Sequence, residues 1–336
     1  MVSYSDIKLN NESLASGGSS PIAAFVGGTA GIGYEALLAL LRYSSSPTIY
    51  IVGRGESRLN SLIETAQTLN ANAKLIPIVA NDLTLVKDAQ KAAEQIAAQA
   101  DHLDLLVTSQ GFISFSSKPE YSTEGLDKVT AIRYHSRFRF IITLLPLLRK
   151  APSPRVISVL ASGQEGPLDL EDLGMTKPEK YGVFYAAGAS SSLTTLAFEE
   201  LSKQKENEKI VFIHIYPGLV STGLQAVGGP APLTFLFNNV LKAVFWLVGY
   251  TPREAGERVL FAATNGRFRK LQPGATGEGT LIQEGSNGSK GSGVYLVQGN
   301  SSVASGNAEL KKLKDQDAGK KVIEYTLNEF ERISKL

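Results

Sequence analysis

The segment Val26–Gly33 combines residue types and a spacing suited to holding a phosphate. It reads Val-Gly-Gly-Thr-Ala-Gly-Ile-Gly and joins the apolar run Ile22–Val26 to a helical pattern that begins near Ile32. Glycines permit a tight turn and close approach of the backbone to a ligand, and the first turn of a helix offers free N–H groups to an anion. The segment predicts a dinucleotide pyrophosphate site, with an ordinary tight turn as the alternative. Its candidate binding residues are Gly27, Thr29, Gly31, Ile32 and Gly33.

Two arginines, Arg54 and Arg58, follow the next apolar run, Thr48–Val52. In a dinucleotide-binding fold the adenosine ribose is recognised about twenty residues after the glycine segment. An acidic residue there binds the ribose hydroxyls of NAD, whereas a guanidinium can pair with the additional phosphate of NADP. Arg54 therefore favours NADP(H) as the cofactor. The alternative is a solvated surface arginine.

Composition limits the class of protein and its partners. The chain has 336 residues, 43% of them hydrophobic, and a net charge of only +2. It can bury a large core, and it offers no electrostatic case for binding nucleic acid, so we expect a small-molecule partner. With no cysteine and three scattered histidines, no metal site is predicted, and a reducing cytoplasmic location fits best.

The order of apolar runs and helical patterns predicts how these residues are positioned. Six β-rich runs alternate with patterns long enough for helical crossovers, and a seventh run, Gly293–Val297, lies within the Gly- and Ser-rich stretch 274–305. This order predicts an α/β fold, a Rossmann-like doubly wound parallel sheet of about seven strands with flanking helices. The first six runs are Ile22–Val26, Thr48–Val52, Lys74–Val79, Leu103–Thr108, Arg155–Leu160 and Val211–Tyr216; the helices between them are expected at 32–43, 56–69, 85–99, 124–150 and 184–205.

One domain over residues 20–305 is expected. Residues 1–19 carry several charges and no continuous apolar core, so they predict a flexible N-terminal tail and no signal peptide. Residues 306–336 predict an amphipathic C-terminal helix. Residues 224–250 are rich in bulky apolar side chains interrupted by polar ones, which favours a lid over an apolar substrate and disfavours a membrane contact. A dimer interface is the alternative, so a homo-oligomer stays open.

Three further turns carry a family resemblance. They are Asp82-Leu83, Thr108-Ser109-Gln110-Gly111 and Pro217-Gly218-Leu219-Val220-Ser221-Thr222, and each follows a predicted strand. Together with the glycine segment they resemble the short-chain dehydrogenase/reductase family over roughly residues 20–270. The resemblance implies an adenine site at Asp82 and Leu83, an adenosine and ribose site at Ser109, Gln110 and Gly111, and a nicotinamide site at Pro217, Gly218, Val220 and Thr222.

The catalytic positions depart from this family, whose usual members use Asn, Ser, Tyr and Lys. Ala161 stands where the serine is expected, and Ser162 fits only after a shift of one residue. Tyr181 matches the tyrosine, but Tyr185 occupies the lysine spacing, and a phenol has no ammonium charge to lower the pKa of Tyr181. Arg133 stands in place of the asparagine. The usual proton relay is therefore predicted to be impaired.

Two strings narrow the resemblance to a divergent fungal branch. They are Arg-Tyr-His-Ser-Arg-Phe-Arg-Phe from residue 133 and Ser-Val-Leu-Ala-Ser-Gly-Gln-Glu-Gly from residue 158. The branch that they resemble includes NADPH-dependent enzymes of indole alkaloid biosynthesis, which reduce an iminium-type intermediate and guide an intramolecular Diels-Alder cyclisation. This resemblance implies a role in fungal secondary metabolism. A hydride can reach an already electrophilic iminium carbon without acid catalysis.

Arg133 is a candidate catalytic residue, because a cation deep in a cleft needs an acidic partner or an anionic ligand. Asp169 is the candidate partner, and Asp172 is nearly as eligible. A carboxylate there would stabilise a cationic substrate or accept a proton from it, whereas a structural salt bridge is the alternative. Tyr134 and His135 are predicted to pack or orient.

Three functions remain open at this point. The first is an NADPH-dependent reductase acting on a large apolar substrate, with an iminium as the reacting group. The second is an ordinary ketone or alcohol short-chain reductase that uses Tyr181. The third is a cofactor-binding pseudoenzyme that serves as a sensor or scaffold.

Overall fold

A computed structural model describes residues 1–221, 226–241, 249–271 and 281–336. Its main element is an eight-stranded sheet with the order β10-β9-β7-β6-β4-β1-β2-β3. Neighbouring strands are parallel except β10, which runs antiparallel to β9. The strands are β1 (Ile22–Val26), β2 (Thr48–Gly53), β3 (Lys74–Val79), β4 (Leu105–Thr108), β6 (Arg155–Val159), β7 (Val211–Ile215), β9 (Val294–Val297) and β10 (Val303–Ala304).

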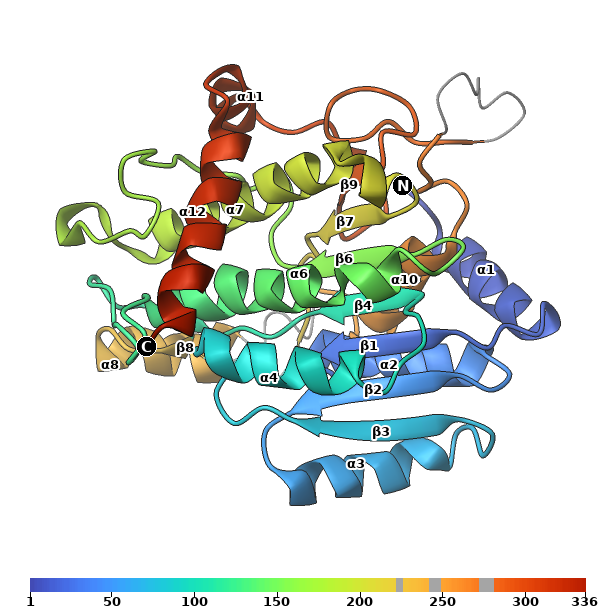
Figure 1. Cartoon of the computed structure of the whole chain (residues 1–336). Coiled ribbons are helices and arrows are strands. Elements are labelled where there is room, and N and C mark those ends of the chain that lie inside the picture. Colours follow the sequence, from blue (N-terminus) through green and yellow to red (C-terminus); the bar gives the residue numbers. More distant parts are fainter. Residues whose placement is uncertain (222–225, 242–248, 272–280) are drawn as a thin grey trace.

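This sheet confirms the predicted Rossmann-like fold (Figure 1). Strands β4, β6, β7 and β9 are buried at every position, as expected where helices cover both faces of a parallel sheet. The chain builds β2 and β3 on one side of β1 and then returns to place β4 on the other. Folds of this kind bind ligands at the carboxyl ends of the two strands beside such a reversal, which here are β1 and β4.

Helices cover the two faces of the sheet because successive strand residues point to opposite sides. In β1, Ala24 and Val26 belong to a hydrophobic cluster with helices α4, α6 and α7, whereas Ala23 and Phe25 belong to a cluster with α2, α3 and α10. Figure 1 shows the first group in front of the sheet. These helices are α2 (Gly31–Tyr43), α3 (Glu56–Gln67), α4 (Val86–Ala97), α6 (Ser136–Leu148), α7 (Val183–Lys203) and α10 (Pro252–Thr264).

The N-terminal segment is not the flexible tail that the sequence predicted. Residues Tyr4–Ser16 form helix α1, and the Ser3 side chain caps it by accepting a bond from the Asp6 amide. Ile7 and Asn11 are fully buried, and the Asn11 side chain donates to the Glu257 carbonyl of α10 at 3.0 Å. Tertiary contacts therefore order a helix whose own sequence is only weakly apolar.

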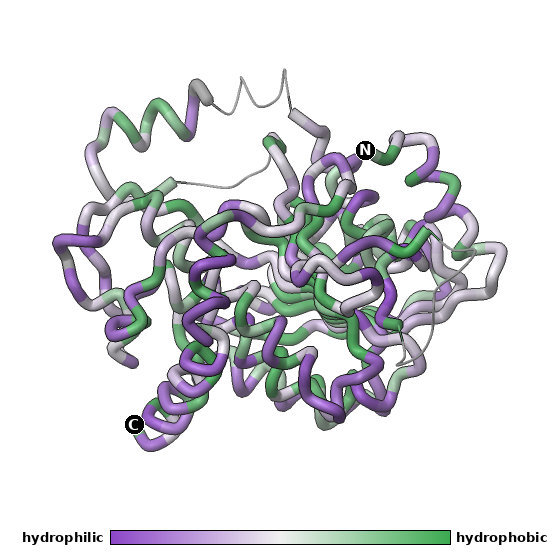
Figure 2. The backbone as a smooth tube through the Cα atoms, turned by 90° about the horizontal axis from the view of Figure 1, so that it is seen from above, coloured by the Kyte–Doolittle hydropathy of each residue, from purple (hydrophilic) through white to green (hydrophobic). Residues whose placement is uncertain are grey.

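The C-terminal segment forms two helices instead of the single one expected. Helix α11 (Ala308–Asp315) ends before Asp317, which has a left-handed φ of 53°, and α12 (Ala318–Ser334) follows. Asp tolerates this conformation better than most residues. The buried residues Val322, Thr326, Phe330 and Ile333 make one stripe along α12, which crosses over α6 and α7 in Figure 1. Figure 2 shows mostly hydrophilic residues on the outer turns of this helix.

The predicted lid, residues 224–250, is described only in part. Residues Ala226–Val227 form β8, which pairs in parallel with β5 (Ile113–Ser114) in a separate two-stranded sheet. Helix α8 (Ala231–Phe235) and a π-helical turn, Leu236–Leu241, follow, with Phe235 66% exposed. The ring of Phe237 meets Phe115 edge to face at 5.6 Å. Residues 224, 225 and 242–248 lie outside the described part.

One predicted helix, 124–150, is divided into segments. Helix α5 (Lys128–Thr130) leads into a five-residue π-helical turn, Ala131–His135, which continues into α6. We call Ala131–His135 the π turn. Two single 3-10 turns, Pro178–Lys180 and Lys205–Asn207, flank α7.

Candidate active site

The glycine segment lies at the carboxyl end of β1, against the turn that follows β4. Gly27 has a φ of 82°, and a Cβ added there would lie 2.6 Å from the Gln110 amide nitrogen. Gly31 begins α2 with a φ of 60°, and Ala30 gives that helix no side-chain cap. Side chains at Gly27 would therefore clash, and the first amides of α2 are not capped by a side chain. Gly27 thus lets the segment pack against the turn after β4, and the amides at the start of α2 fit a pyrophosphate.

The end of β2, directly before Arg54, lies against this segment. The Thr29 side chain packs against Gly53, the residue directly before Arg54. Arg54 and Arg58 are exposed at the start of α3. Their guanidinium groups are accessible to a phosphate on the ribose of a dinucleotide bound at the glycine segment.

The turns after β3 and β4 carry the residues that were predicted to bind the adenosine. Asp82 is exposed, and its Oδ1 accepts bonds from the Thr84 amide and hydroxyl at 2.8 and 2.7 Å, while Leu83 is buried. Ser109 donates to the Gly27 carbonyl at 3.2 Å, Gln110 donates to the Ser136 hydroxyl at 3.2 Å, and Gly111 is exposed. The structure thus brings Gly27 and Ser109 into contact, as a common dinucleotide site requires.

The turn after β7 carries the residues that were predicted to bind the nicotinamide. Gly218 has a φ of 78°, and Val220 bridges to Tyr250, the last residue of the predicted lid. Gly299 packs against Pro217, because a Cβ there would lie 2.9 Å from the Pro217 carbonyl oxygen. The predicted nicotinamide residue Thr222 lies outside the described residues.

Arg133 is buried at the centre of the π turn, but its environment differs from the prediction. Its Nη2 donates to the Phe112 carbonyl at 2.8 Å, and the acidic group that acts on it is Asp127. Burial lowers the pKa of Arg133, and nearby Tyr181 and Asp127 oppose that change. Arg133 remains a cation even so, because a guanidinium is so basic.

Asp169 is not the partner of Arg133, so that prediction was wrong. Its Oδ2 accepts from the Lys177 and Lys180 ammonium groups at 3.0 and 2.8 Å. These two lysines, Lys180 foremost, hold the pKa of Asp169 well below its ordinary value. Asp172 instead closes the adjoining turn, accepting bonds from the Thr176 amide and hydroxyl. Local lysines, a few residues along the chain, reach Asp169 more readily than a buried arginine does.

Asp127 is a candidate site residue that the sequence did not indicate. It is 1% exposed, and its Oδ1 accepts a hydrogen bond of 3.0 Å from the Tyr181 hydroxyl. Its Oδ2 caps α5 by accepting from the Thr130 amide and hydroxyl, both at 2.9 Å. Burial, reinforced by Asp127, raises the pKa of Tyr181. The Tyr181 proton is therefore held against a carboxylate. Tyr185, at the lysine spacing, is half-buried and lies near Asp169.

Arg137, one helical turn after Arg133, is a second residue that sequence reasoning missed. Its guanidinium is 2% exposed and donates to the Ser158 hydroxyl at 2.8 Å, the Val159 carbonyl at 2.9 Å and the Gln110 carbonyl. It thereby joins the carboxyl ends of β4 and β6. Burial, with a smaller effect of Arg133, lowers the pKa of Arg137 to about 9.

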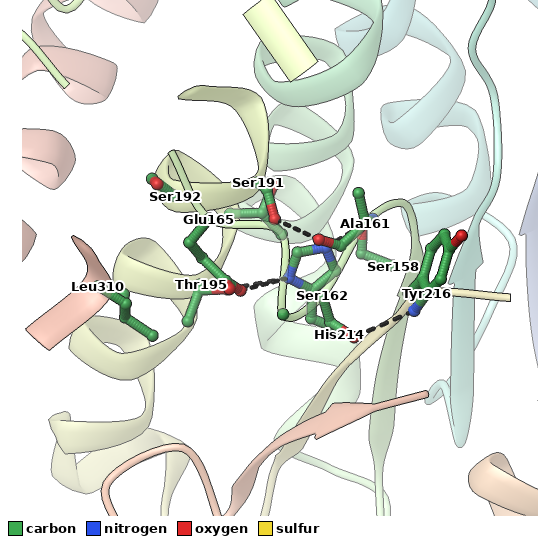
Figure 3. Close-up of polar contacts among 12 residues, drawn as sticks. Ser158, Ala161, Ser162, Glu165, Ser191, Ser192, Thr195, His214, Tyr216 and Leu310 are labelled. Carbon is green, nitrogen blue, oxygen red and sulfur yellow. Dashed lines mark hydrogen bonds and ion pairs between the residues drawn. The ribbon is translucent and has the colours of Figure 1, made fainter. Parts of the chain in front are cut away.

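The loop after β6 is fixed by a buried polar chain (Figure 3). The Ala161 amide donates to His214 Nε2 at 3.1 Å, so the histidine carries its proton on Nδ1 and donates to the Thr195 hydroxyl at 2.9 Å. Thr195 in turn donates to Glu165 at 2.8 Å. The chain orients the loop through His214, which stays neutral.

Ser162, the proposed substitute for the missing serine, has structural partners. Its hydroxyl donates to the Val297 carbonyl at 2.8 Å and accepts from the Tyr216 amide at 3.1 Å. Ser162 is fully buried. The hydroxyl therefore joins the ends of β7 and β9 and is fully occupied there.

The glycine segment, the parallel sheet and the turns at its carboxyl edge define a dinucleotide-binding oxidoreductase fold. The family model for short chain dehydrogenase matches residues 21–230, and the chain belongs to this family. Within the described ranges, no three His, Cys, Asp or Glu residues are grouped to hold a metal, and no helix has the length and apolarity to cross a membrane.

Fungal proteins are among its relatives. The oxidoreductase AN1596 of Emericella nidulans is 34% identical over 308 residues, which cover 90% of this chain and 91% of that protein. The oxidoreductase andH of Emericella variicolor is 33% identical over 343 residues, covering 99% and 98%. The short-chain dehydrogenase/reductase SAT2 of Stachybotrys chartarum is 31% identical over 337 residues, covering 95% and 94%.

Solved structures confirm the fold. A short chain dehydrogenase from Shigella flexneri, complexed with NADP, aligns with a TM-score of 0.54 and 18% identity, covering 75% of this chain and 95% of that one. The RhlG/NADP active-site complex of Pseudomonas aeruginosa aligns with a TM-score of 0.54 and 21% identity, covering 74% and 91%.

Proposed function

We propose that this protein is an NADPH-dependent reductase of fungal secondary metabolism that acts on a large apolar substrate carrying an iminium group. The observation that carries this proposal is the hydrogen bond from Tyr181 to Asp127. It holds the only tyrosine at the family's proton-donor position against a buried carboxylate, with no lysine at the usual spacing. An iminium needs no proton donor for its reduction.

The choice of NADPH rests on exposed Arg54 and Arg58 beside the glycine segment. Two neighbours in fold are described as complexes with NADP, which supports the same choice by analogy. When bound, NADPH supplies a hydride, whose addition to the carbon of a C=N⁺ group gives a neutral amine with no proton transferred. The residues of the chain then have only to bind, orient and exclude water.

Within the site, Asp127 and Arg133 supply the charges that bind and orient a cationic substrate. The Asp127 carboxylate is buried beside Tyr181 and within the electrostatic reach of Arg133. It stabilises a nearby cation by electrostatic attraction, as it does the Arg133 guanidinium. The exposed apolar residues Phe235 and Leu236 of the lid and Phe184 at the start of α7 suit an apolar substrate. We extend the proposal to an intramolecular [4+2] cyclisation, which the reduced product would undergo in the same site.

Ketone reduction is a second candidate, because one observation favours it. A second buried guanidinium group, Arg137, lies within the electrostatic reach of Arg133, and the one carboxylate that acts on Arg133 is Asp127. An excess of positive charge stabilises a developing alkoxide better than it stabilises a cation. Tyr181 would then have to give up its proton despite Asp127.

One experiment separates these functions. A bicyclic iminium salt and the ketone of the same ring skeleton are each incubated with the protein and NADPH deuterated at the transferred position. Deuterium in the product is measured by NMR, for the wild type and for Tyr181→Phe, with the exposed Tyr121→Phe as the matched control.

We expect deuterium in the amine formed from the iminium probe. Tyr181→Phe should lower the rate of this reduction at most about threefold. Ketone reduction through a general acid would instead fall by about a hundredfold or more. The absence of deuterium transfer to both probes would contradict the proposal and leave the cofactor-binding pseudoenzyme. The same product mixtures report any cyclised isomer when a substrate with a pendant alkene is used.

A further inference from the structure

The π turn that carries Arg133 is an irregular element that needs support from its surroundings. A π-helical turn inserts an extra residue into a helix, has poorer hydrogen-bond geometry than α-helix and is often found at functional sites. Here it lies between α5, which Asp127 caps, and α6, which begins at Ser136. The turn therefore sets the relative position of Asp127 and Arg133.

Helix α12 contacts the π turn through two consecutive pairs of residues. The Tyr134 hydroxyl lies 2.6 Å from Thr326 Oγ1, and His135 Nε2 lies 3.1 Å from the Tyr325 hydroxyl. Thr326 donates its own proton to the Val322 carbonyl at 2.7 Å, so Tyr134 must be the donor to Thr326. Tyr134, His135 and Thr326 are at most 1% exposed, so water does not replace these bonds.

The far end of α12 holds the chain on the other side of Asp127. Arg332 Nη2 donates to the Glu124 carbonyl at 2.7 Å and is itself held by Glu329 at 2.6 Å. The Glu124 carboxylate accepts from the amides of Val86 and Lys87 at the start of α4, at 2.6 and 2.9 Å. Helix α12 is thus hydrogen-bonded both to the segment before Asp127 and to the π turn after it.

We propose that α12 is a positioning element that fixes the positions of Asp127 and Arg133 relative to Tyr181. The family model ends at residue 230, so α12 lies outside the part of the chain that this model matches. The inference rests on the proposed function for what those residues do. The predicted cofactor-binding residues lie instead at the ends of β1, β2, β3, β4 and β7. Loosening α12 should therefore slow hydride transfer and leave NADPH affinity unchanged.

The test is the double variant Tyr325→Phe/Thr326→Val, which removes two hydroxyl groups and keeps the shape of both side chains. Loss of about 1–2 kcal/mol of local hydrogen bonding accelerates exchange through local opening by about 5- to 30-fold. We expect hydrogen exchange over residues 128–137 to rise by that factor, measured by mass spectrometry. The turnover number with the iminium probe should fall about tenfold, and the NADPH Kd, from calorimetry, should stay within about twofold.

Thr326→Ser is the rescue, because it keeps the hydroxyl that accepts from Tyr134, and Leu327→Ala is the control on an exposed position of the same helix. Both variants should match the wild type in hydrogen exchange over residues 128–137, in turnover number and in NADPH Kd. Unchanged exchange over 128–137, or faster exchange throughout the chain with weaker NADPH binding, would overturn the inference. Exchange is measured without substrate, so a wild type inactive on the iminium would contradict the proposed function alone.

Discussion

At the scale of single residues, the proposed chemistry depends on the pairing of Tyr181 with Asp127. The two are 54 residues apart in the chain and meet in a bond of 3.0 Å. The sequence indicated Tyr181 and Arg133 through their positions in recognised strings. It did not indicate Asp127, which resembles any helix cap, or Arg137, because a charged helical residue is ordinarily exposed. Contacts between distant segments decide both roles.

Arg54 tests the choice of cofactor at this scale. Replacing Arg54 with Ala removes a charged partner for the ribose phosphate, a bond worth about 1.5–3 kcal/mol, so NADPH affinity should fall about ten- to a hundredfold. NADH affinity should not change. Calorimetry at constant salt measures both. Lys91→Ala, an exposed cation on α4, is the control. Equal losses for NADPH and NADH, or no loss, would disprove the role of Arg54.

At the scale of elements, seven strands of the main sheet and a C-terminal helical segment were predicted, whereas helix α1 and the two-residue strands β5, β8 and β10 were not. Buried parallel strands are apolar along their whole length, so β4, β6 and β7 stand out in the sequence. Helix α1 has few apolar residues and is ordered by its contacts with α10. The π turn has no pattern of its own, because the extra residue is accommodated by packing against α12.

Ile7 tests whether α1 is part of the folded domain. Its side chain is fully buried, so Ile7→Ala should lower the free energy of unfolding by about 2–4 kcal/mol, as expected for removing a buried aliphatic side chain. Leu9, on the same helix, is 64% exposed. Leu9→Ala should therefore change the free energy of unfolding by less than about 0.5 kcal/mol. Urea denaturation followed by circular dichroism measures both. If neither substitution changed the free energy of unfolding, α1 would behave as a flexible tail and the prediction would be contradicted.

At the scale of the whole molecule, two buried histidines connect stability to pH. Burial lowers the pKa of His135 to about 4 and that of His214 to about 3, from an ordinary value of 6.5. Glu329 and Arg332 act on His135, and Arg137 acts on His214, which also lies 3.8 Å from Glu165. Below pH 6.5 the unfolded chain binds protons that the folded chain excludes, so stability falls with falling pH.

Between pH 6 and pH 5 the two histidines together should lower the free energy of unfolding by about 2 kcal/mol. Glu165 offsets part of this, because burial raises its pKa and favours proton uptake by the folded state. Urea denaturation at the two pH values gives the difference. In the double variant His135→Gln/His214→Asn the difference should shrink, whereas in His102→Gln, at a partly exposed position, it should persist. An unchanged difference in the double variant would refute this assignment.

In the proposed reaction, hydride transfer needs no proton from Tyr181. The most direct measurement is the solvent isotope effect on single-turnover reduction of the iminium probe by the NADPH-loaded protein in H₂O and D₂O. Because no proton is transferred in that step, we predict equal rates, a ratio of about 1. A ratio above about 2 would show general acid catalysis and contradict the account.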